Sequence, residues 1–309
     1  MFKVAVQTGG LDERFGVDKA YQLIKEAGFD GVDANVNHLQ RYGMIQDRVL
    51  GPAFSPELSE KEMLEYFRPF GEAAKKYGLD NYQAHAPYPS MITSDMNDPF
   101  NTVMMDVLKK TIVGCASIDC QNLTIHPFFC NYDNQMDRRT EWELNIARYS
   151  ELAEVSKKYG VRINLENMFT GHKGKLYAAC CNSGPEAAKY VDELNRLCGE
   201  DTFGFCMDTG HALIASLDIK QFLTDLGDRI TCFHVHDNDG VHDDHQAPYT
   251  GKLDWDRFME GLQAIGFDRT LSFETHNAVC SVPEELIPQT LQYICACGRL
   301  FSDKASKKE

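Results

Sequence analysis

A short apolar segment followed by a longer amphipathic segment recurs about eight times along this chain of 309 residues. The apolar segments are rich in β-branched residues, and they predict strands at 4–6, 31–36, 82–86, 123–125, 162–165, 203–207, 230–235 and 271–273. The amphipathic segments predict helices at 17–27, 60–77, 99–116, 141–159, 185–197, 219–226, 255–265 and 283–300. Strict alternation of strands and helices is typical of a parallel sheet with helices packed on it.

Four of the predicted helices end at a glycine, at Gly28, Gly78, Gly160 and Gly266. Each glycine is followed by an apolar residue and then by a strand, a pattern typical of a left-handed helix cap. Eight strand–helix units in a chain of this length predict a single (β/α)8 TIM barrel over residues 1–309, with the active site at the C-terminal ends of the strands. An open doubly wound sheet is the alternative, but no glycine-rich phosphate loop follows the first strand.

The composition is typical of a soluble globular protein, with 43% hydrophobic and 25% charged residues. No segment approaches the ~20 consecutive apolar residues that span a membrane. The first residues, MFKVAVQTGG, lack the pattern of a signal peptide, and we therefore expect a cytoplasmic protein. The 11 cysteines show no repeated C-x-x-C spacing, so we expect free thiols in a reducing compartment rather than disulfides.

The formal net charge is −15, and this acidic balance argues against nucleic acid as a partner. Binding to nucleic acid relies on a basic surface, whereas the lysine-rich run of this chain is confined to the C-terminal segment 304–308. We expect a small-molecule carbohydrate as the partner and no membrane association. The sequence leaves open whether the chain forms a homo-oligomer or a hetero-complex.

Six consecutive predicted strands each end in a residue that can bind a metal. These residues are His85, His126, Glu166, Asp208, His234 and Glu274. A single histidine or glutamate at a strand end is usually structural, but the ends of barrel strands converge on one axis, and nothing structural requires the same chemistry from six of them. The segment after the seventh strand adds further histidines and carboxylates, at His236, Asp237, Asp239, His242, Asp243, Asp244 and His245.

Imidazole nitrogens and carboxylate oxygens together form sites for divalent metals, and a mixed set favours Mn²⁺, with Zn²⁺, Co²⁺ and Mg²⁺ as alternatives. Glu166 and Glu274 are predicted to flank this metal, with Asp208 and His234 between them. Two carboxylates in this arrangement can remove a proton from one face of a substrate carbon and return a proton to the other face. The pattern therefore indicates proton transfer through an enediolate, with Glu166 and Glu274 as the acid–base pair.

Short motifs around these residues resemble those of a known family. They are HAPY at His85, NLEN at Glu166, MDTGH at 207–211, H-x-x-D at His234, D-x-H at Asp243 and FET at Glu274. From Val4 to about His276, the chain resembles the xylose isomerase-like TIM barrels, which include ketose 3-epimerases, sugar-phosphate isomerases, inosose dehydratase and the endonuclease IV type of DNA repair enzyme. The resemblance to the ketose epimerases implies a substrate-contacting role for His211 and four metal ligands, Glu166, Asp208, His234 and Glu274.

The nuclease branch of the family is similar at further positions. Its three-metal site also uses histidines that match His85 and His126 and an Asp-x-His pair that matches Asp243 and His245. The epimerases have an arginine shortly after their strand-seven histidine, and this chain has none near Gly240. We expect a single metal, with a dinuclear or trinuclear site as the alternative. The remaining residues are interpreted as substrate-binding or second-metal residues: His85, His126, His211, Asp243 and His245.

These features predict a metal-dependent isomerase or epimerase of a small sugar, ketose or polyol-derived ketone. A metal-dependent lyase, either a dehydratase or an enzyme that cleaves an oxidised glycoside, would use the same residues and is the first alternative. An endonuclease IV-like zinc phosphodiesterase is the second, although the acidic charge and the lack of arginine-rich or aromatic loops argue against it. A non-catalytic sugar-binding subunit is the weakest alternative, because binding alone does not require two carboxylates on a metal.

Overall fold

Eight parallel strands form the central sheet of the computed structural model, which describes residues 2–93, 95–128 and 136–306. In chain order they are β1 (Lys3–Gln7), β2 (Gly31–Asn35), β3 (Asp80–His85), β4 (Asn122–Thr124), β5 (Arg162–Glu166), β8 (Phe203–Asp208), β9 (Ile230–His234) and β10 (Thr270–Phe273). Neighbouring strands follow the order β10-β1-β2-β3-β4-β5-β8-β9. The ring closes between β9 and β10, where the Val235 amide donates to the Ser272 carbonyl at 2.9 Å and the Glu274 amide donates to the Val235 carbonyl at 3.1 Å. The predicted barrel is therefore confirmed.

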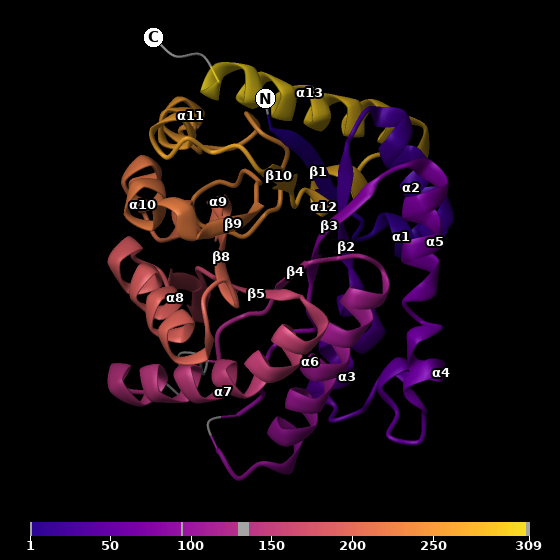
Figure 1. Ribbon diagram of the computed structural model, residues 1–309. Helices are drawn as coiled ribbons and strands as arrows, with labels where there is room; N and C mark the ends of the chain where they lie inside the picture. The colour runs from indigo at the N-terminus through magenta and orange to yellow at the C-terminus, as the bar shows by residue number, and fades with distance from the viewer. Residues whose placement is uncertain (1, 94, 129–135, 307–309) are drawn as a thin grey trace.

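The longer helices surround the ring of strands (Figure 1). They are α2 (Val17–Ala27), α5 (Arg68–Tyr77), α6 (Pro99–Ser117), α7 (Arg138–Tyr159), α8 (Gly184–Cys198), α10 (Ile219–Leu226), α11 (Trp255–Ala264) and α13 (Ile287–Ala305). Shorter helices lie in the connections: α1 (Leu11–Phe15), η1 (Val36–Gln40), α3 (Tyr42–Gln46), η2 (Pro52–Phe54), α4 (Glu60–Leu64), α9 (Thr209–Ile214), η4 (Gly227–Arg229), α12 (His276–Cys280) and η5 (Glu284–Leu286). The last helix, α13, packs between α2 and α11 and so completes the outer layer.

Glycines end the helices where the sequence predicts. Gly28, Gly78 and Gly160 follow α2, α5 and α7 with φ angles of 98°, 62° and 69°, which lie in the left-handed region that glycine adopts without strain. The prediction of one helix over 60–77 is wrong, because the segment forms two helices, α4 and α5. Pro69 lies in the first turn of α5, and a proline lacks the amide hydrogen that a continuous helix would need there.

A β-hairpin that the sequence pattern does not predict separates β5 from α8. Its strands, β6 (Phe169–His172) and β7 (Lys175–Ala178), pair antiparallel. Lys173 and Gly174 form the turn, with φ angles of 49° and 75°, and two-residue hairpin turns of the commonest type require positive φ at both positions. Because the hairpin follows β5 directly, it lies at the end of the barrel where the strands finish.

Aromatic side chains fill the space between the strands and the helices. Phe233 of β9 contacts Phe258 of α11 and Phe267 at ring-centroid distances of 5.9 and 5.0 Å. Inside the barrel the packing is polar: the Gln83 side chain donates to Asp33 at 2.7 Å and to the Phe233 carbonyl at 3.0 Å. This polar layer lies directly below the strand ends and supports the residues described next.

The ten cysteines among the described residues are free thiols, and most of them are buried. This agrees with the expectation that cysteine serves here as a small apolar residue. Among the described residues, no helix is both long and apolar enough to cross a membrane.

Candidate metal centre

Four acidic and imidazole side chains converge where the barrel strands finish. Glu166, Asp208 and His234 are the last residues of β5, β8 and β9, and Glu274 directly follows β10. Each offers one ligand atom, and these atoms all lie within 4.8 Å of one another. All four residues are buried, so the group could hold an ion that is shielded from bulk water.

His234 lies at the middle of this group. Its Nδ1 is 2.8 Å from Glu166 Oε1 and 3.4 Å from Glu274 Oε2, while its Nε2 is 3.2 Å from Asp33 Oδ2. The buried Asp33 accepts a hydrogen bond from Gln83, which fixes the carboxylate. A carboxylate on the far side of an imidazole orients the ring and leaves the other nitrogen available for a metal. The arrangement therefore presents His234 Nδ1 to the two glutamates.

The local charges keep the carboxylates ionised. Burial opposes ionisation of Glu274, but the imidazoles of His234, His245 and His85 outweigh it and lower the pKa of this carboxyl to about 2. Burial likewise opposes the charge on Glu166, and His234 and His126 hold the pKa of this group well below its usual value. Since metal ligands must be deprotonated, a cation bound by this group would replace a proton on His234.

A first outer group extends from Glu166. His85 Nε2 and His126 Nε2 are 3.1 Å apart, and Glu166 Oε2 lies 3.2 Å from His126 Nε2 and 3.8 Å from His85 Nε2. His85 Nδ1 is 2.7 Å from the Ala86 carbonyl, which requires a donor nitrogen and leaves Nε2 of the neutral ring as an acceptor. Glu166 Oε2 is buried and accepts no hydrogen bond of good geometry from the described residues, so an acceptor oxygen and an acceptor nitrogen both lie close to His126 Nε2.

A second outer group lies on the other side of the centre. Asp243 Oδ2 is 2.9 Å from His245 Nε2 and 3.6 Å from His211 Nε2. His211 Nδ1 is 2.8 Å from the Asn167 carbonyl, so its Nε2 is the nitrogen that faces the site. The structure thus brings all the predicted site residues into one connected cluster at the strand ends.

Two further side chains contact the cluster: His236, which the sequence places after the seventh strand without indicating a role, and Gln7, which the sequence does not single out. His236 Nε2 is 3.1 Å from Asp208 Oδ2, and its ring stacks on His245 at a centroid distance of 4.2 Å. Gln7, at the end of β1, donates to Glu274 Oε1 at 2.6 Å. The period of two along an extended strand could have indicated His236, because it places this residue on the same side as His234.

Aromatic side chains line the approach to the cluster. Tyr88 stacks on His126 at a centroid distance of 4.9 Å, and Phe169 packs edge-on against His211 at 4.8 Å. Burial, with a smaller contribution from Glu274, raises the pKa of Tyr88 to about 12, so the phenol stays neutral. In contrast, His242 is at the surface and pairs with Asp239 at 2.8 Å, away from the buried cluster.

Residues 21–297 match the model of the xylose isomerase-like TIM barrel family, and the chain belongs to this family. The chain is 25% identical to the ketose 3-epimerase of Arthrobacter globiformis over 45% of its own length and 43% of that protein. It is also 28% identical to a probable endonuclease 4 of Staphylococcus carnosus over 72% of its own length and 69% of that protein. A crystal structure of the IOLI protein with a binding zinc atom has the same fold, with a TM-score of 0.67, 17% identity and coverage of 99% of this chain and 98% of that one.

Proposed function

We propose that the protein is a divalent-metal-dependent isomerase or epimerase of a small sugar, ketose or polyol-derived ketone. The observation that carries this proposal is the approach of two glutamates to one imidazole nitrogen. Glu166 from β5 and Glu274 after β10 lie 2.8 and 3.4 Å from His234 Nδ1, although these strands are not neighbours in the ring. The similarity to a ketose 3-epimerase supports the same assignment.

The residues of the centre fit a divalent cation. Glu166, Asp208 and Glu274 bring three carboxylates to His234 within 4.8 Å, and buried charge of one sign is costly unless an opposite charge compensates it. Glu166 Oε2 and Asp243 Oδ1 are buried without a hydrogen-bond partner among the described residues. The mixed oxygen and nitrogen donors favour Mn²⁺, with Zn²⁺, Co²⁺ and Mg²⁺ as alternatives, and the zinc atom in the related IOLI structure supports a divalent ion.

When bound, such a cation would stabilise negative charge that develops on a substrate oxygen. The two glutamates supply the proton transfer: one takes a proton from the substrate carbon, and the other, or water through it, returns one to the opposite face. The hydrogen bond from Gln7 holds Glu274 Oε1, so Oε2 is the oxygen that remains for proton transfer.

The outer residues bind substrate or a second metal in this account. Tyr88 and Phe169 would contact the apolar face of a sugar and exclude water, because aromatic rings pack well on such surfaces. The polar residues assigned to hydroxyl groups or a second ion are His85, His126, His211, Asp243 and His245. A small carbohydrate is thus the proposed partner, and the free thiols support a cytoplasmic location.

A second candidate is a multinuclear phosphodiesterase of the endonuclease IV type. The observation that favours it is the presence of two outer groups, one around Glu166 and one around Asp243. Within each group, neighbouring imidazole and carboxylate atoms lie 2.9 to 3.8 Å apart. The similarity to a probable endonuclease 4 supports it as well. The net charge of −15 argues against a nucleic-acid substrate, and for this reason the isomerase is the first candidate.

Deuterium uptake tests the proposal. A panel of ketoses, inososes and oxidised glycosides is incubated with metal-loaded protein in heavy water, beside a DNA duplex that contains an abasic site. The proposal predicts deuterium at the carbon beside the carbonyl of a recovered sugar. Deuterium in an eliminated product would identify a lyase. Cleavage of the duplex without uptake in any sugar would show that the protein is a nuclease instead.

A further inference from the structure

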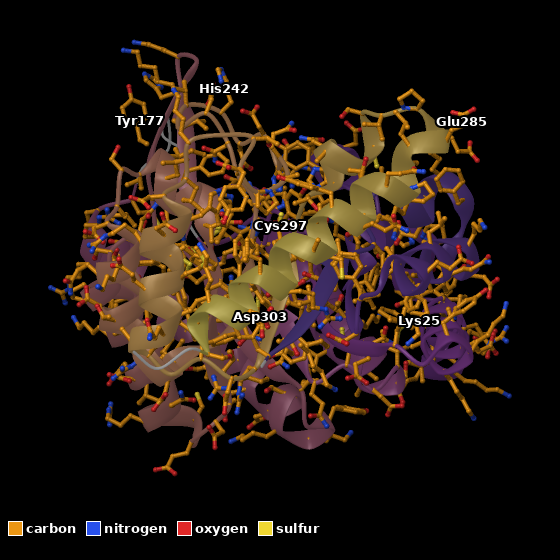
Figure 2. All side chains as sticks on the ribbon, turned by 90° about the horizontal axis from the view of Figure 1, so that it is seen from above. Lys25, Tyr177, His242, Glu285, Cys297 and Asp303 are labelled. Carbon is orange, nitrogen blue, oxygen red and sulfur yellow. The ribbon has the colours of Figure 1, made fainter. Side chains whose placement is uncertain are left out.

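The β6–β7 hairpin carries two lysines at the mouth of the barrel. Figure 2 shows Tyr177 of β7 and His242 at the same upper edge of the molecule, where the hairpin rises above the helices. A cavity of about 500 Å³ lies between the hairpin and segment 241–243, and its lining includes Lys173, Lys175 and Asp243. Because Asp243 also contacts His245 and His211 in the candidate metal centre, the cavity adjoins the proposed reaction site.

The two lysines have no carboxylate partner in the part of the chain that the structure describes. Six other lysines of the described chain pair with an acidic residue, namely Lys3, Lys76, Lys109, Lys110, Lys220 and Lys304, whereas further surface lysines such as Lys61 and Lys75 do not. The chain has 46 acidic and 31 basic residues, so acidic partners are plentiful. Exposed ammonium groups that remain unpaired beside an acidic site leave positive charge available for a ligand.

Lys173 also occupies a backbone position that does not favour lysine. Its φ angle of 49° is in the left-handed region, where the first residue of such a turn is usually asparagine, aspartate or glycine. The geometry of the turn therefore gives no reason for a lysine at this position. The effect of the lysine is to place a cation at the hairpin tip, beside the second cation at Lys175.

We propose that Lys173 and Lys175 bind the phosphate group of a phosphorylated sugar whose reacting carbon lies between Glu166 and Glu274. The inference rests on the proposed function and narrows its substrate to phosphate monoesters. Two ammonium groups match the charge of a phosphate dianion, and lysine is a common phosphate ligand. A volume of about 500 Å³ is within the usual range for a small-molecule site.

The surrounding charges determine how the substrate lies. His242 lines the same cavity, but its Nδ1 is 2.8 Å from Asp239 Oδ2, so its charge is already paired. The buried carboxylates of the centre repel a phosphate, whereas the hairpin attracts it. The phosphate therefore lies at the hairpin, and the carbonyl end of the sugar points toward the glutamates.

The test compares a ketose that carries a terminal phosphate with the same ketose without it. The readout is kcat/KM for deuterium uptake, and the quantity of interest is the ratio of the phosphorylated to the free sugar. We expect a ratio above one in the wild type and a fall of about tenfold in the double variant Lys173→Ala/Lys175→Ala, mainly through KM. The variant Lys173→Arg/Lys175→Arg should keep the ratio, and added salt should lower it.

The matched control is Lys61→Ala/Lys75→Ala, which removes two exposed lysines that also lack ion pairs among the described residues. This control should keep the wild-type ratio. An unchanged ratio in the hairpin double variant would overturn the inference. A ketose with a terminal carboxylate is tested beside the ketose with a terminal phosphate. If Lys173 and Lys175 raise kcat/KM for the carboxylate but not for the phosphate, the phosphate assignment is wrong.

Calorimetric titration of metal-loaded protein with inorganic phosphate separates this inference from the proposed function. Phosphate binding that weakens in the hairpin double variant, without deuterium uptake in any ketose, would contradict the proposed function and support the anion site. If the protein exchanges deuterium into a ketose, but neither phosphate binding nor the kcat/KM ratio changes in the hairpin double variant, the anion site is contradicted and the proposed function is not.

Discussion

The two ends of the barrel both carry charged residues, but the charges are paired in different ways. At the end where the strands begin, acidic and basic side chains lie at the surface in pairs of opposite sign. Lys3 of β1 is 2.5 Å from Asp80 of β3, and Arg162 of β5 is 3.3 Å from Asp201. In exposed pairs of this kind, each charge is hydrated and already has a partner of opposite sign, and each pair contributes little to stability.

At the end where the strands finish, the carboxylates are buried. Among the described residues, the ion pairs of Glu166, Asp208 and Glu274 are with histidines, not with lysine or arginine. Histidine is neutral or charged according to pH, so it is a poor permanent counter-charge. One end of the barrel thus pairs its charges within the protein, and we propose that a bound cation balances the buried carboxylates at the other end.

The largest expected effect follows from removing a carboxylate at the strand ends. Glu166→Gln and Glu274→Gln keep the side-chain volume but remove the base, which contributes on the order of 10²–10⁴-fold. Each variant should lose at least about that factor in deuterium uptake, even with excess metal. Asp80→Asn at the other end of the barrel is the matched control and should keep the wild-type rate. Similar losses in all three variants would mean that the two ends do not differ as described.

Removing the metal should affect stability as well as activity. A cation that binds only the folded protein at 100 times its dissociation constant stabilises it by about 2.7 kcal/mol. Treatment with a chelator should therefore lower the Tm by several degrees, and Mn²⁺ should restore it. Differential scanning calorimetry measures this change. A Tm that the chelator leaves unchanged would indicate that the buried carboxylates need no cation.

A smaller effect is expected at the residue behind His234. Asp33→Asn removes the charge that orients the imidazole but leaves all the ligands in place, and changes of this kind cost about 10–100-fold in metal affinity. Deuterium uptake should fall at limiting Mn²⁺ and recover at high Mn²⁺. Recovery distinguishes a positioning residue from a base, because Glu274→Gln should not recover. Loss of uptake at all Mn²⁺ concentrations would contradict the positioning role.

The smallest effect concerns a buried carboxylate outside the centre. Burial raises the pKa of Asp12 from 3.8 to about 6, against the opposing effects of His38 and Thr8, whereas the pKa of Glu274 falls to about 2. A raised pKa stabilises the fold fully below about pH 4, and this contribution is lost as the pH rises through 6. Asp12→Asn should therefore gain stability relative to the wild type between pH 4.5 and 7.5 in urea unfolding. If the difference in unfolding free energy between Asp12→Asn and the wild type stays constant across this pH range, the pKa of Asp12 is not raised.

The sequence predicts the barrel because its signals are local and repeated. Each strand is a short apolar run, and each of the four predicted caps has a glycine with positive φ, as at Gly28 and Gly266. The hairpin escapes prediction because β6 and β7 are short and only one of their residues, Thr170, is buried, so burial leaves no apolar pattern in them. The split between α4 and α5 depends on Pro69, which is compatible with a helix start as well as with a helix interruption.

The strand-end residues of the site are also predictable, because a closed barrel brings all strand ends together. The residues that hold these side chains in place cannot be predicted in the same way, since their roles depend on contacts between strands. Asp33 approaches His234 Nε2 across the barrel interior, and Gln7 reaches Glu274 from β1. No spacing in the sequence encodes these contacts, and a polar residue within a predicted strand is the one signal that could have indicated Asp33.

Titration calorimetry of chelator-treated protein with Mn²⁺ tests most directly whether a cation completes the charge at the strand ends. We expect the wild type and Asp80→Asn to bind about one equivalent, and Asp208→Asn, which keeps the shape of a ligand but removes its charge, to bind Mn²⁺ much more weakly. No uptake by the wild type, or equal uptake by Asp208→Asn and the wild type, would contradict this account.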